Sequence, residues 1–192
     1  DLHVSNLLTY CSLAAATGAV AAALGGAGMP VAGALLAAAA LFDALDGAFA
    51  RLFVRSVRQR QLGGELDSLV DAIAFGLAPV VVLATLPDRA VGGVSLLWWI
   101  GAFAYVGGTV TRLGFYNVEQ DEAHFVGIPT PAAALIWSTA LLFSPPAWLV
   151  AALLFGCAAA MIAPLPIPRP RGAALGVFAL WAVVLIGRHA LA

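Results

Sequence analysis

Four aspartates lie close together in a sequence that is otherwise rich in apolar residues. Asp43 and Asp46 are three positions apart, and Asp67 and Asp71 are four positions apart. Residues at these separations lie on one face of an α-helix, so each pair presents its carboxylates together. At the centre of a bilayer an ionised acid costs about 3 kcal/mol even on a mild insertion scale. Four carboxylates in such a chain therefore need cations, or some other function, to persist.

Small residues and an arginine accompany the aspartates. Gly47 and Ala50 continue the helix face of the first pair, Arg51 follows at once, and Gly63 lies four positions before the second pair. Carboxylates, water and substrate phosphates are the ligands that Mg²⁺ and Mn²⁺ favour, and paired ions suit phosphoryl transfer. Gly47 allows a nucleotide to approach the helix closely, and the Arg51 guanidinium can donate a fork of hydrogen bonds to phosphate. The pattern predicts one or two Mg²⁺ or Mn²⁺ ions and a phosphate-bearing substrate.

The composition is that of a membrane protein. Hydrophobic residues make up 62% of the 192 residues, charged residues make up 10%, and the mean hydropathy is +0.99, outside the range of soluble domains. In hydrocarbon the backbone must satisfy its own hydrogen bonds in helices or in a closed barrel, and the apolar runs lack the period-2 alternation of a barrel. We therefore expect an all-α fold, a polytopic bundle of transmembrane helices.

Seven apolar stretches are candidates for the roughly 20 residues that a spanning helix needs. Gly- and Pro-rich turns and charged stretches separate them. The predicted helices cover residues 5–26, 30–54, 63–86, 92–117, 128–144, 147–163 and 172–190. The sixth is short for a span. No linker is long enough to divide the chain, so we expect residues 1–192 to form a single membrane-embedded domain.

Nine arginines and no lysine carry the positive charge. Seven of them lie on one side of the predicted bundle, namely Arg51, Arg55, Arg58, Arg60, Arg112, Arg169 and Arg171. The other two, Arg89 and Arg188, lie on the opposite side. Because cytoplasmic loops carry the excess of positive charge, we expect the aspartates to face the cytoplasm, in the plasma membrane of a prokaryote. We interpret Arg55, Arg58 and Arg60 as topology determinants that contact anionic headgroups. The net charge of −1 indicates no nucleic-acid partner.

The beginning of the chain reads as a spanning helix. Its first apolar segment lacks the basic start and the cleavage site of a signal peptide. The chain begins with Asp1 and not with Met, so we expect the native start to have been trimmed. Cys11 and Cys157 lie within predicted apolar helices, and we interpret both as small hydrophobic residues.

The two motifs together, D-x-x-D-G-x-x-A-R and then G-x-x-x-D-x-x-x-D, resemble the signature of the CDP-alcohol phosphotransferases, which are integral membrane enzymes. The resemblance implies a six-helix core, here with one or two additional helices. It also implies two divalent cations, Mg²⁺ or Mn²⁺, held by Asp43, Asp46, Asp67 and Asp71, with Asp71 also accepting the proton of the acceptor alcohol. The donor would be a CDP-linked lipid. Members of the family are often homodimers, so a homodimer is a possible assembly.

The resemblance extends to residues that would bind the donor nucleotide and its phosphates, namely Asn6, Thr9, Gly47, Ala50, Arg51, Ser56 and Gly63. Asn6 and Thr9 lie at the matching distance upstream of the first motif, with ordinary helix capping as the alternative. The spacer from Leu52 to Leu62 has eleven residues, whereas eight are usual in the family. We expect a loop between helices to absorb the three extra residues. Ser56 is the only candidate for a hydroxyl residue that usually precedes the second glycine.

The segment Phe125–Ala134 is similar to the F-x-G-L-P-x-P-A-A-A segment of the CDP-diacylglycerol–serine O-phosphatidyltransferases, the phosphatidylserine synthases. This resemblance implies transfer of a phosphatidyl group from CDP-diacylglycerol to L-serine, giving phosphatidylserine and CMP. The residues that would bind the acceptor are Arg112, Asn117, Pro129 and Thr130. That subfamily usually reads R-L-A-R-F-N where this chain has Arg112 to Asn117, so its second arginine is Phe115 here. Either the serine pocket is altered or another residue substitutes. The alternative for Arg112 is a side chain that snorkels to the interface.

Other functions remain open at this point. The same chemistry could use glycerol phosphate, inositol phosphate or choline as acceptor, or an archaeal ether lipid as donor. Phosphorylated acceptors call for more basic residues than the chain offers, which favours an unphosphorylated alcohol. A cation transporter could also place acids in the membrane, but it would not need Gly47, Ala50 and Arg51 at these offsets.

Overall fold

The computed structural model describes residues 3–86, 96–119, 124–164, 166–168 and 172–192. Nearly all of this is helical, and each predicted span corresponds to a helix. The helical elements are η1 (Val4–Asn6), α1 (Leu7–Leu24), α2 (Met29–Ala50), α3 (Val57–Asp71), η2 (Ala72–Leu77), α4 (Ala78–Ala84), α6 (Leu96–Glu119), α7 (Thr130–Leu141), α8 (Ala147–Ile162) and α9 (Ala173–Ala190). The expected helical bundle is therefore confirmed.

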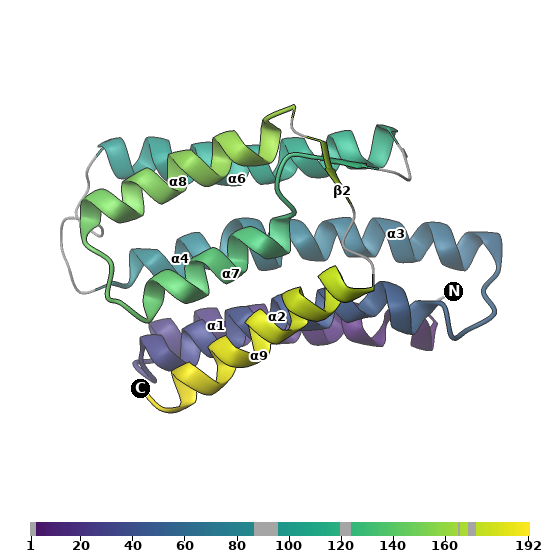
Figure 1. Cartoon of the computed structure of the whole chain (residues 1–192), viewed down its shortest axis with the longest axis horizontal. Helices are drawn as coiled ribbons and strands as arrows, with labels where there is room; N and C mark the ends of the chain where they lie inside the picture. The colour runs from purple at the N-terminus through teal and green to yellow at the C-terminus, as the bar shows by residue number, and fades with distance from the viewer. Residues whose placement is uncertain (1–2, 87–95, 120–123, 165, 169–171) are drawn as a thin grey trace.

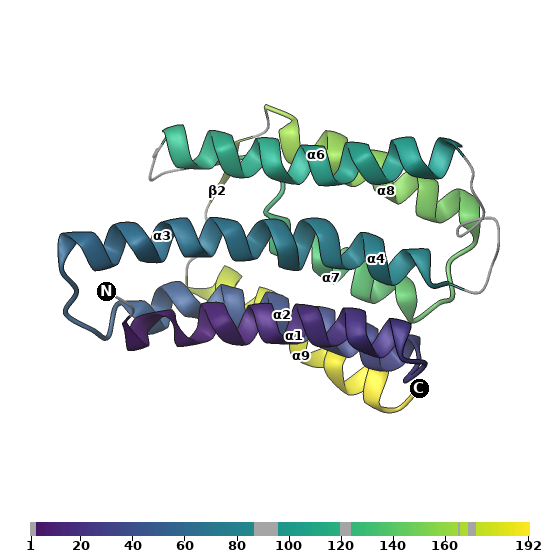
Figure 2. The ribbon, with the colours of Figure 1, turned by 180° about the vertical axis from the view of Figure 1, so that it is seen from behind.

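The helices form three layers (Figure 1). One layer holds α6 and α8, the middle layer holds α7 and the rod made of α3, η2 and α4, and the third holds α1, α2 and α9. Seen from behind, the rod runs without a break between α6 and the pair α1 and α2 (Figure 2). Its 28 residues, Val57–Ala84, carry Asp67 and Asp71 into the middle of the bundle.

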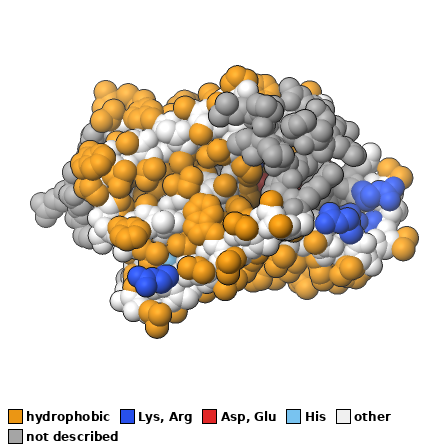
Figure 3. All heavy atoms as spheres, in the orientation of Figure 1, with side chains coloured by type: hydrophobic (Ala, Val, Ile, Leu, Met, Phe, Trp, Pro, Cys, Tyr) orange, Lys and Arg blue, Asp and Glu red, His pale blue; other side chains and the backbone are white. Residues whose placement is uncertain are grey.

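The helices are long and apolar enough for a polytopic membrane protein. By length and hydropathy, four stretches of the described chain could cross a membrane: Val4–Leu24, Met29–Ala50, Val57–Ala84 and Ala173–Ala190. Hydrophobic side chains are spread over the visible surface, while arginine side chains gather at the end where α3 begins (Figure 3). Arg188 lies in the last turn of α9, at the opposite end. Arg89, Arg169 and Arg171 lie outside the described residues.

Several helix boundaries differ from the predicted ones. α2 ends at Ala50, four residues before the predicted end at Val54. α3 begins at Val57, six residues before the predicted start, because Ser56 and Gln59 form a capping box. Ser56 Oγ accepts from the Gln59 N–H at 3.2 Å, and Gln59 Oε1 accepts from the Ser56 N–H at 2.9 Å. The long spacer is therefore only partly a loop, and its second half is the first turn and a half of α3. α7 has only 12 residues, which rise about 18 Å and cannot span a bilayer alone.

A small sheet lies within the helical fold. Strand β1 (His124–Val126) pairs antiparallel with β2 (Pro166–Pro168), with Phe125 opposite Ile167. The strands link the segment before α7 to the segment after α8, although nothing in the sequence predicted them.

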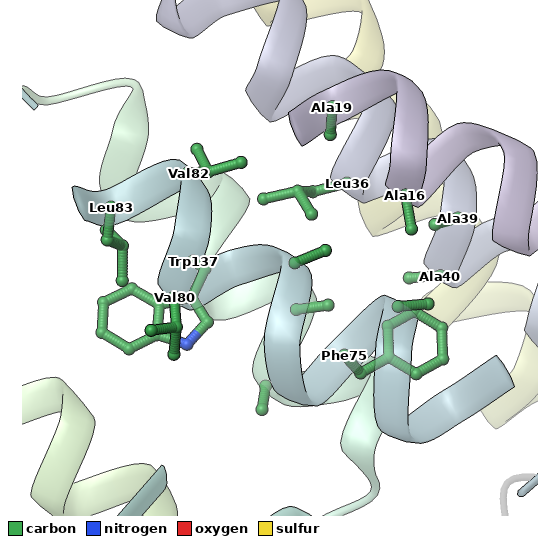
Figure 4. Packing of buried hydrophobic residues seen from close by; sticks show 14 of the residues in the cluster. Ala16, Ala19, Leu36, Ala39, Ala40, Phe75, Val80, Val82, Leu83 and Trp137 are labelled. Carbon is green, nitrogen blue, oxygen red and sulfur yellow. The ribbon is translucent and has the colours of Figure 1, made fainter. Parts of the chain in front are cut away.

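Alanines allow the central helices to pack closely. Ala16 and Ala19 of α1 and Ala39 and Ala40 of α2 are fully buried, with Ala40 beside the ring of Phe75 in the rod and Ala19 beside Leu36 (Figure 4). Small side chains at a helix interface let the backbones approach, which is how membrane helices associate without a strong hydrophobic driving force. This packing brings the end of α2 beside α3.

The rod passes Pro79 without breaking. Proline has no N–H, so the carbonyl four residues earlier, that of Phe75, loses its helical partner. Tyr105 of α6 donates its hydroxyl to the Phe75 carbonyl at 2.7 Å, and Tyr105 is fully buried. Because no water can satisfy this carbonyl in hydrocarbon, the hydroxyl stabilises the rod immediately after Asp71.

His189 anchors α9 to the bundle. Its Nε2 lies 2.9 Å from the Ser138 carbonyl and 3.2 Å from Ser138 Oγ, and Ser138 Oγ donates to the Gly33 carbonyl at 2.8 Å. The His189 ring occupies the space where a Cβ at position 33 would lie, so only glycine fits there. Closer to the start of α9, Trp181 Nε1 donates to Thr139 Oγ1 at 3.3 Å.

We expect Tyr105→Phe to lower the free energy of unfolding by about 1 to 3 kcal/mol, because the buried Phe75 carbonyl loses its donor. The measurement is the midpoint of thermal unfolding in detergent micelles. Tyr10→Phe is the matched control, since the Tyr10 side chain is 42% exposed. Equal midpoints for the two variants would contradict this role of Tyr105.

Candidate active site

The four aspartates converge between α2 and α3. One carboxylate oxygen from each of Asp43, Asp46 and Asp67 lies within 4.8 Å of the others. Asp71 completes the group, because Asp43 reaches Asp71 and Asp46 reaches Asp67 at hydrogen-bonding distance. Like-charged carboxylates so close together repel one another unless protons or cations lie between them.

The carboxylate oxygens offer ligand positions for hard cations. Asp67 Oδ1 and Asp71 Oδ1 are buried, and neither has a hydrogen-bond partner among the residues that the structure describes. A buried carboxylate oxygen without a donor is unfavourable, whereas oxygen ligands of this kind suit Mg²⁺ or Mn²⁺. The donor set and its geometry therefore fit divalent cations.

Two threonines orient the aspartates. Thr9 Oγ1 of α1 donates to Asp46 Oδ2 at 3.2 Å, and Thr130 Oγ1, at the start of α7, donates to Asp71 Oδ2 at 3.2 Å. Thr130 is fully buried and Thr9 is 6% exposed. Sequence reasoning assigned these threonines to the nucleotide and to the acceptor, and it missed their contacts with the aspartates.

A cavity of about 910 Å³ opens beside all four aspartates. Its polar lining includes Arg51, Ser68, Arg112, Tyr116 and Thr130. Its apolar lining comes mainly from α2 and α9, with Ala44, Ala48, Ala174, Leu175, Val177, Phe178 and Trp181. The side that α9 forms is therefore apolar and is called the apolar end, whereas the side of Asp71, Arg112 and Thr130 carries polar and acidic groups and is called the polar end.

A second cavity, of about 280 Å³, lies on the α1 side of the aspartates. Its lining includes six of the seven residues predicted to bind the donor nucleotide, namely Asn6, Thr9, Gly47, Ala50, Arg51 and Gly63. The two cavities share Asp46, Gly47, Arg51 and Asp67. Asp46 and Asp67 thus lie where the two cavities meet, and Asp43 and Asp71 face the large cavity only.

Arg55 and Arg60 also line the small cavity, although their sequence interpretation was limited to topology and headgroup contact. The length of the spacer was the signal that could have revealed them, because three extra residues change which side chains reach the site. Ser56, predicted to bind the nucleotide, lies outside the lining of both cavities and caps α3.

Arg112 is buried at the polar end of the large cavity. Its side chain is 6% exposed, and its charge lies close enough to interact with Asp71 and Asp43. Tyr116, one helical turn further on, lines the same cavity. Phe115 is 48% exposed and lies outside this lining, so the position where the resembling enzymes carry a second arginine does not face the described cavity.

Asn117 lies beside the site and not in it. Its Oδ1 accepts from Ser68 Oγ at 3.0 Å, and Ser68 lines the large cavity. Asn117 itself is absent from the described lining. The contact of Asn117 with the described cavity is therefore through Ser68.

The backbone conformation of the segment before α7 requires glycine at position 127. Its φ of +72° favours glycine, and a Cβ there would collide with the Met161 carbonyl. The next residue, Ile128, donates its N–H to the Ala160 carbonyl at 3.0 Å. These contacts with α8 hold Pro129 and Thr130 against the large cavity, as predicted.

Known proteins share this sequence pattern. The CDP-alcohol phosphatidyltransferase family matches residues 2–165. A CDP-diacylglycerol–serine O-phosphatidyltransferase of Mycobacterium tuberculosis is 41% identical over 112 residues, which cover 53% of this chain and 36% of that protein. One of Helicobacter pylori is 34% identical over 105 residues, covering 53% of this chain and 42% of that protein.

An archaeal relative carries a different name. The archaetidylserine synthase of Methanothermobacter thermautotrophicus is 34% identical over 106 residues, covering 55% of this chain and 43% of that protein. In all three alignments the matched segment is less than half of the relative's length. The match to residues 2–165 includes every helix from α1 to α8, together with all four aspartates. The chain therefore belongs to the CDP-alcohol phosphatidyltransferase family.

Proposed function

We propose that the protein transfers a phosphatidyl group from CDP-diacylglycerol to the hydroxyl of L-serine, giving phosphatidylserine and CMP. The observation that carries this proposal is that all four aspartates line a large cavity with an apolar end, and that two of them, Asp46 and Asp67, also line a small polar cavity. A donor with a nucleotide at one end and lipid tails at the other needs such a site. The names of the relatives support the same reaction.

Asp43, Asp46, Asp67 and Asp71 would hold two divalent cations, Mg²⁺ or Mn²⁺. When bound, such ions neutralise the diphosphate and stabilise the charge on the leaving CMP. The buried oxygens of Asp67 and Asp71 that have no partner among the described side chains support this assignment.

The residues of the two cavities bind different parts of the donor. Asn6 and Thr9 lie on the nucleotide side, and Gly47 and Ala50 keep the α2 face low enough for the diphosphate to approach. Arg51 lines both cavities, so its guanidinium can donate to the phosphates between them. Gly63 leaves space for Asn6, because a Cβ there would lie 3.2 Å from Asn6 Oδ1.

The lipid tails of the donor occupy the apolar end of the large cavity. Ala44 and Ala48 of α2 leave room opposite Leu175 and Phe178 of α9. The acyl chains come from the hydrocarbon of the bilayer, so these apolar side chains replace contacts with lipid by similar contacts with protein. α9 lies beyond the residues that the family matches, so a helix outside the matched region supplies this wall.

The acceptor serine binds at the polar end, between Arg112 and Asp71. Arg112 pairs with the serine carboxylate, and Asp71 accepts the hydroxyl proton as the serine oxygen attacks the lipid-side phosphorus. The new P–O bond forms as the bond to CMP breaks, and CMP leaves with the electron pair. Thr130 keeps Asp71 in position through its hydrogen bond.

The gathering of arginines near the start of α3 supports a cytoplasmic active site in a prokaryotic plasma membrane. Both CMP and serine are soluble, and Asp43 and Asp46 lie in the C-terminal half of α2, which leads toward this end of the bundle.

We expect CMP release by the purified protein, with CDP-diacylglycerol and Mn²⁺ in detergent, to require L-serine and to stop when a chelator removes the metal. Glycerol 3-phosphate, inositol, inositol phosphate and choline are the comparison acceptors, and an ether-linked donor tests the lipid. Release with a different acceptor would overturn the serine assignment and keep the metal site. No metal-dependent release with any acceptor would overturn the transferase proposal.

The four aspartates should differ in what they do. We expect Asp71→Asn to reduce kcat by about 100-fold or more while CMP binding persists, because the proton acceptor is lost. Asp43→Asn or Asp46→Asn should weaken Mn²⁺ and CMP binding together, by more than the roughly tenfold typical of an outer-shell partner. Calorimetric titration of Mn²⁺ and CMP, beside kcat, separates these effects. Equal and modest losses at every position would argue against this division of roles.

Arg112→Ala should raise the KM for serine by about 10- to 100-fold and leave the KM for CDP-diacylglycerol unchanged, because a buried charged hydrogen bond is lost. Arg112→Lys should recover part of the loss, since it restores the charge without the fork. Phe115→Ala, at the exposed position beside it, is the control. A parallel rise in both KM values would mean that Arg112 supports the fold of the site and does not bind serine.

A further inference from the structure

Two arginines of the long spacer, Arg55 and Arg60, reach the small cavity together with Arg51. Arg55 lies in the loop that follows α2, and Arg60 lies in the first turns of α3. Arg58, on the same stretch, is exposed and lies outside the described lining of both cavities. The spacer therefore sends two of its three arginines to the site.

The position of Arg55 is defined by its neighbours. A Cβ at Gly63 would lie 3.5 Å from Arg55 Nη1 and 3.2 Å from Asn6 Oδ1, so the guanidinium and the Asn6 amide both border the same glycine. The charge of Arg55 is close enough to interact with Asp46. The guanidinium therefore lies between the Asn6 amide and the aspartates.

Arg60 holds the Arg55 segment in place. Its Nη1 donates to the Arg55 carbonyl at 3.1 Å. The capping box of Ser56 and Gln59 fixes the turn between the two arginines. Because these contacts set the backbone of Arg55, Arg60 acts on Arg55 as a positioning residue as well as lining the cavity.

A buried donor points to a ligand in this cavity. Asn6 is 4% exposed, and its Nδ2 has no hydrogen-bond partner among the described residues. A buried amide N–H without a partner is unfavourable, and it lies beside a cavity of about 280 Å³ that arginines also line. Clustered guanidinium and amide donors are suited to phosphate oxygens and to the polar edge of a nucleoside.

We propose that Arg55 binds the cytidine-side phosphate of the donor, and that Arg60 positions Arg55 through its backbone. This inference rests on the proposed function, because it takes the donor to be a CDP-linked lipid. Arg51 and Arg55 then contact the diphosphate from two sides, and the longer spacer supplies the second contact.

The test is binding of CMP and of cytidine to the purified protein in detergent with Mn²⁺, measured by calorimetry. Arg55→Ala should weaken CMP binding by about 10- to 100-fold and leave cytidine, which has no phosphate, unchanged. Arg55→Lys should bind CMP with intermediate affinity, because it keeps the charge and loses the fork. Arg60→Ala should weaken CMP binding less than Arg55→Ala, and Arg58→Ala is the matched control.

Several results would overturn the inference. They are CMP binding by Arg55→Ala equal to that of the wild type, an equal loss of CMP and cytidine, or the same loss in Arg58→Ala. Thermal unfolding midpoints show whether each variant folds. If Arg55→Ala does not fold, CMP binding by Arg55→Lys is compared with that of the wild type instead. CMP binding needs no acceptor, so a wild-type protein that binds CMP but transfers to no alcohol would defeat the proposed function alone. A wild-type protein that binds no CMP would defeat both.

Discussion

Mutual repulsion among four carboxylates in an apolar bundle is the constraint on which the site depends. Asp43 and Asp46 lie in the last two turns of α2, and Asp67 and Asp71 lie in the rod that crosses the middle layer. Alanine packing brings these helices together, so the fold itself forces the acids into contact. The threonines on α1 and α7 and the nearby charge of Arg112 offset part of this repulsion. Divalent cations at the unpartnered oxygens of the described site would offset the rest.

The same arrangement separates the two ends of an amphipathic substrate. The small cavity has guanidinium, amide and hydroxyl groups, whereas the far end of the large cavity is lined by apolar side chains of α2 and α9. Specificity for the head group and accommodation of the tails can therefore change independently. The family match covers residues 2–165, so the α9 part of the wall for the tails lies outside the matched region, whereas all four aspartates lie inside it.

Much of this could be predicted from the sequence, because helical periodicity fixes which residues share a face. The two aspartate motifs and the seven spans followed from spacing and hydropathy, whereas the assignment of Pro129 and Thr130 came from the resemblance of their segment to a known family. The sequence could not show that Arg55 and Arg60 line the small cavity, because their positions depend on how the spacer folds. The capping box at Ser56 turned an expected loop into helix. The pairing of β1 with β2 is a contact between segments distant in sequence, which local sequence patterns do not predict.

The anchoring of α9 has a consequence for the lipid tails of the donor. Its hydrogen bonds to α7 come from Trp181, at the middle of the helix, and from His189, near its end. The helix also packs against α2. These contacts fix the position of Leu175 and Phe178, which line the large cavity. Because the donor diffuses in the plane of the bilayer, the position of α9 determines which apolar side chains its tails meet in this cavity.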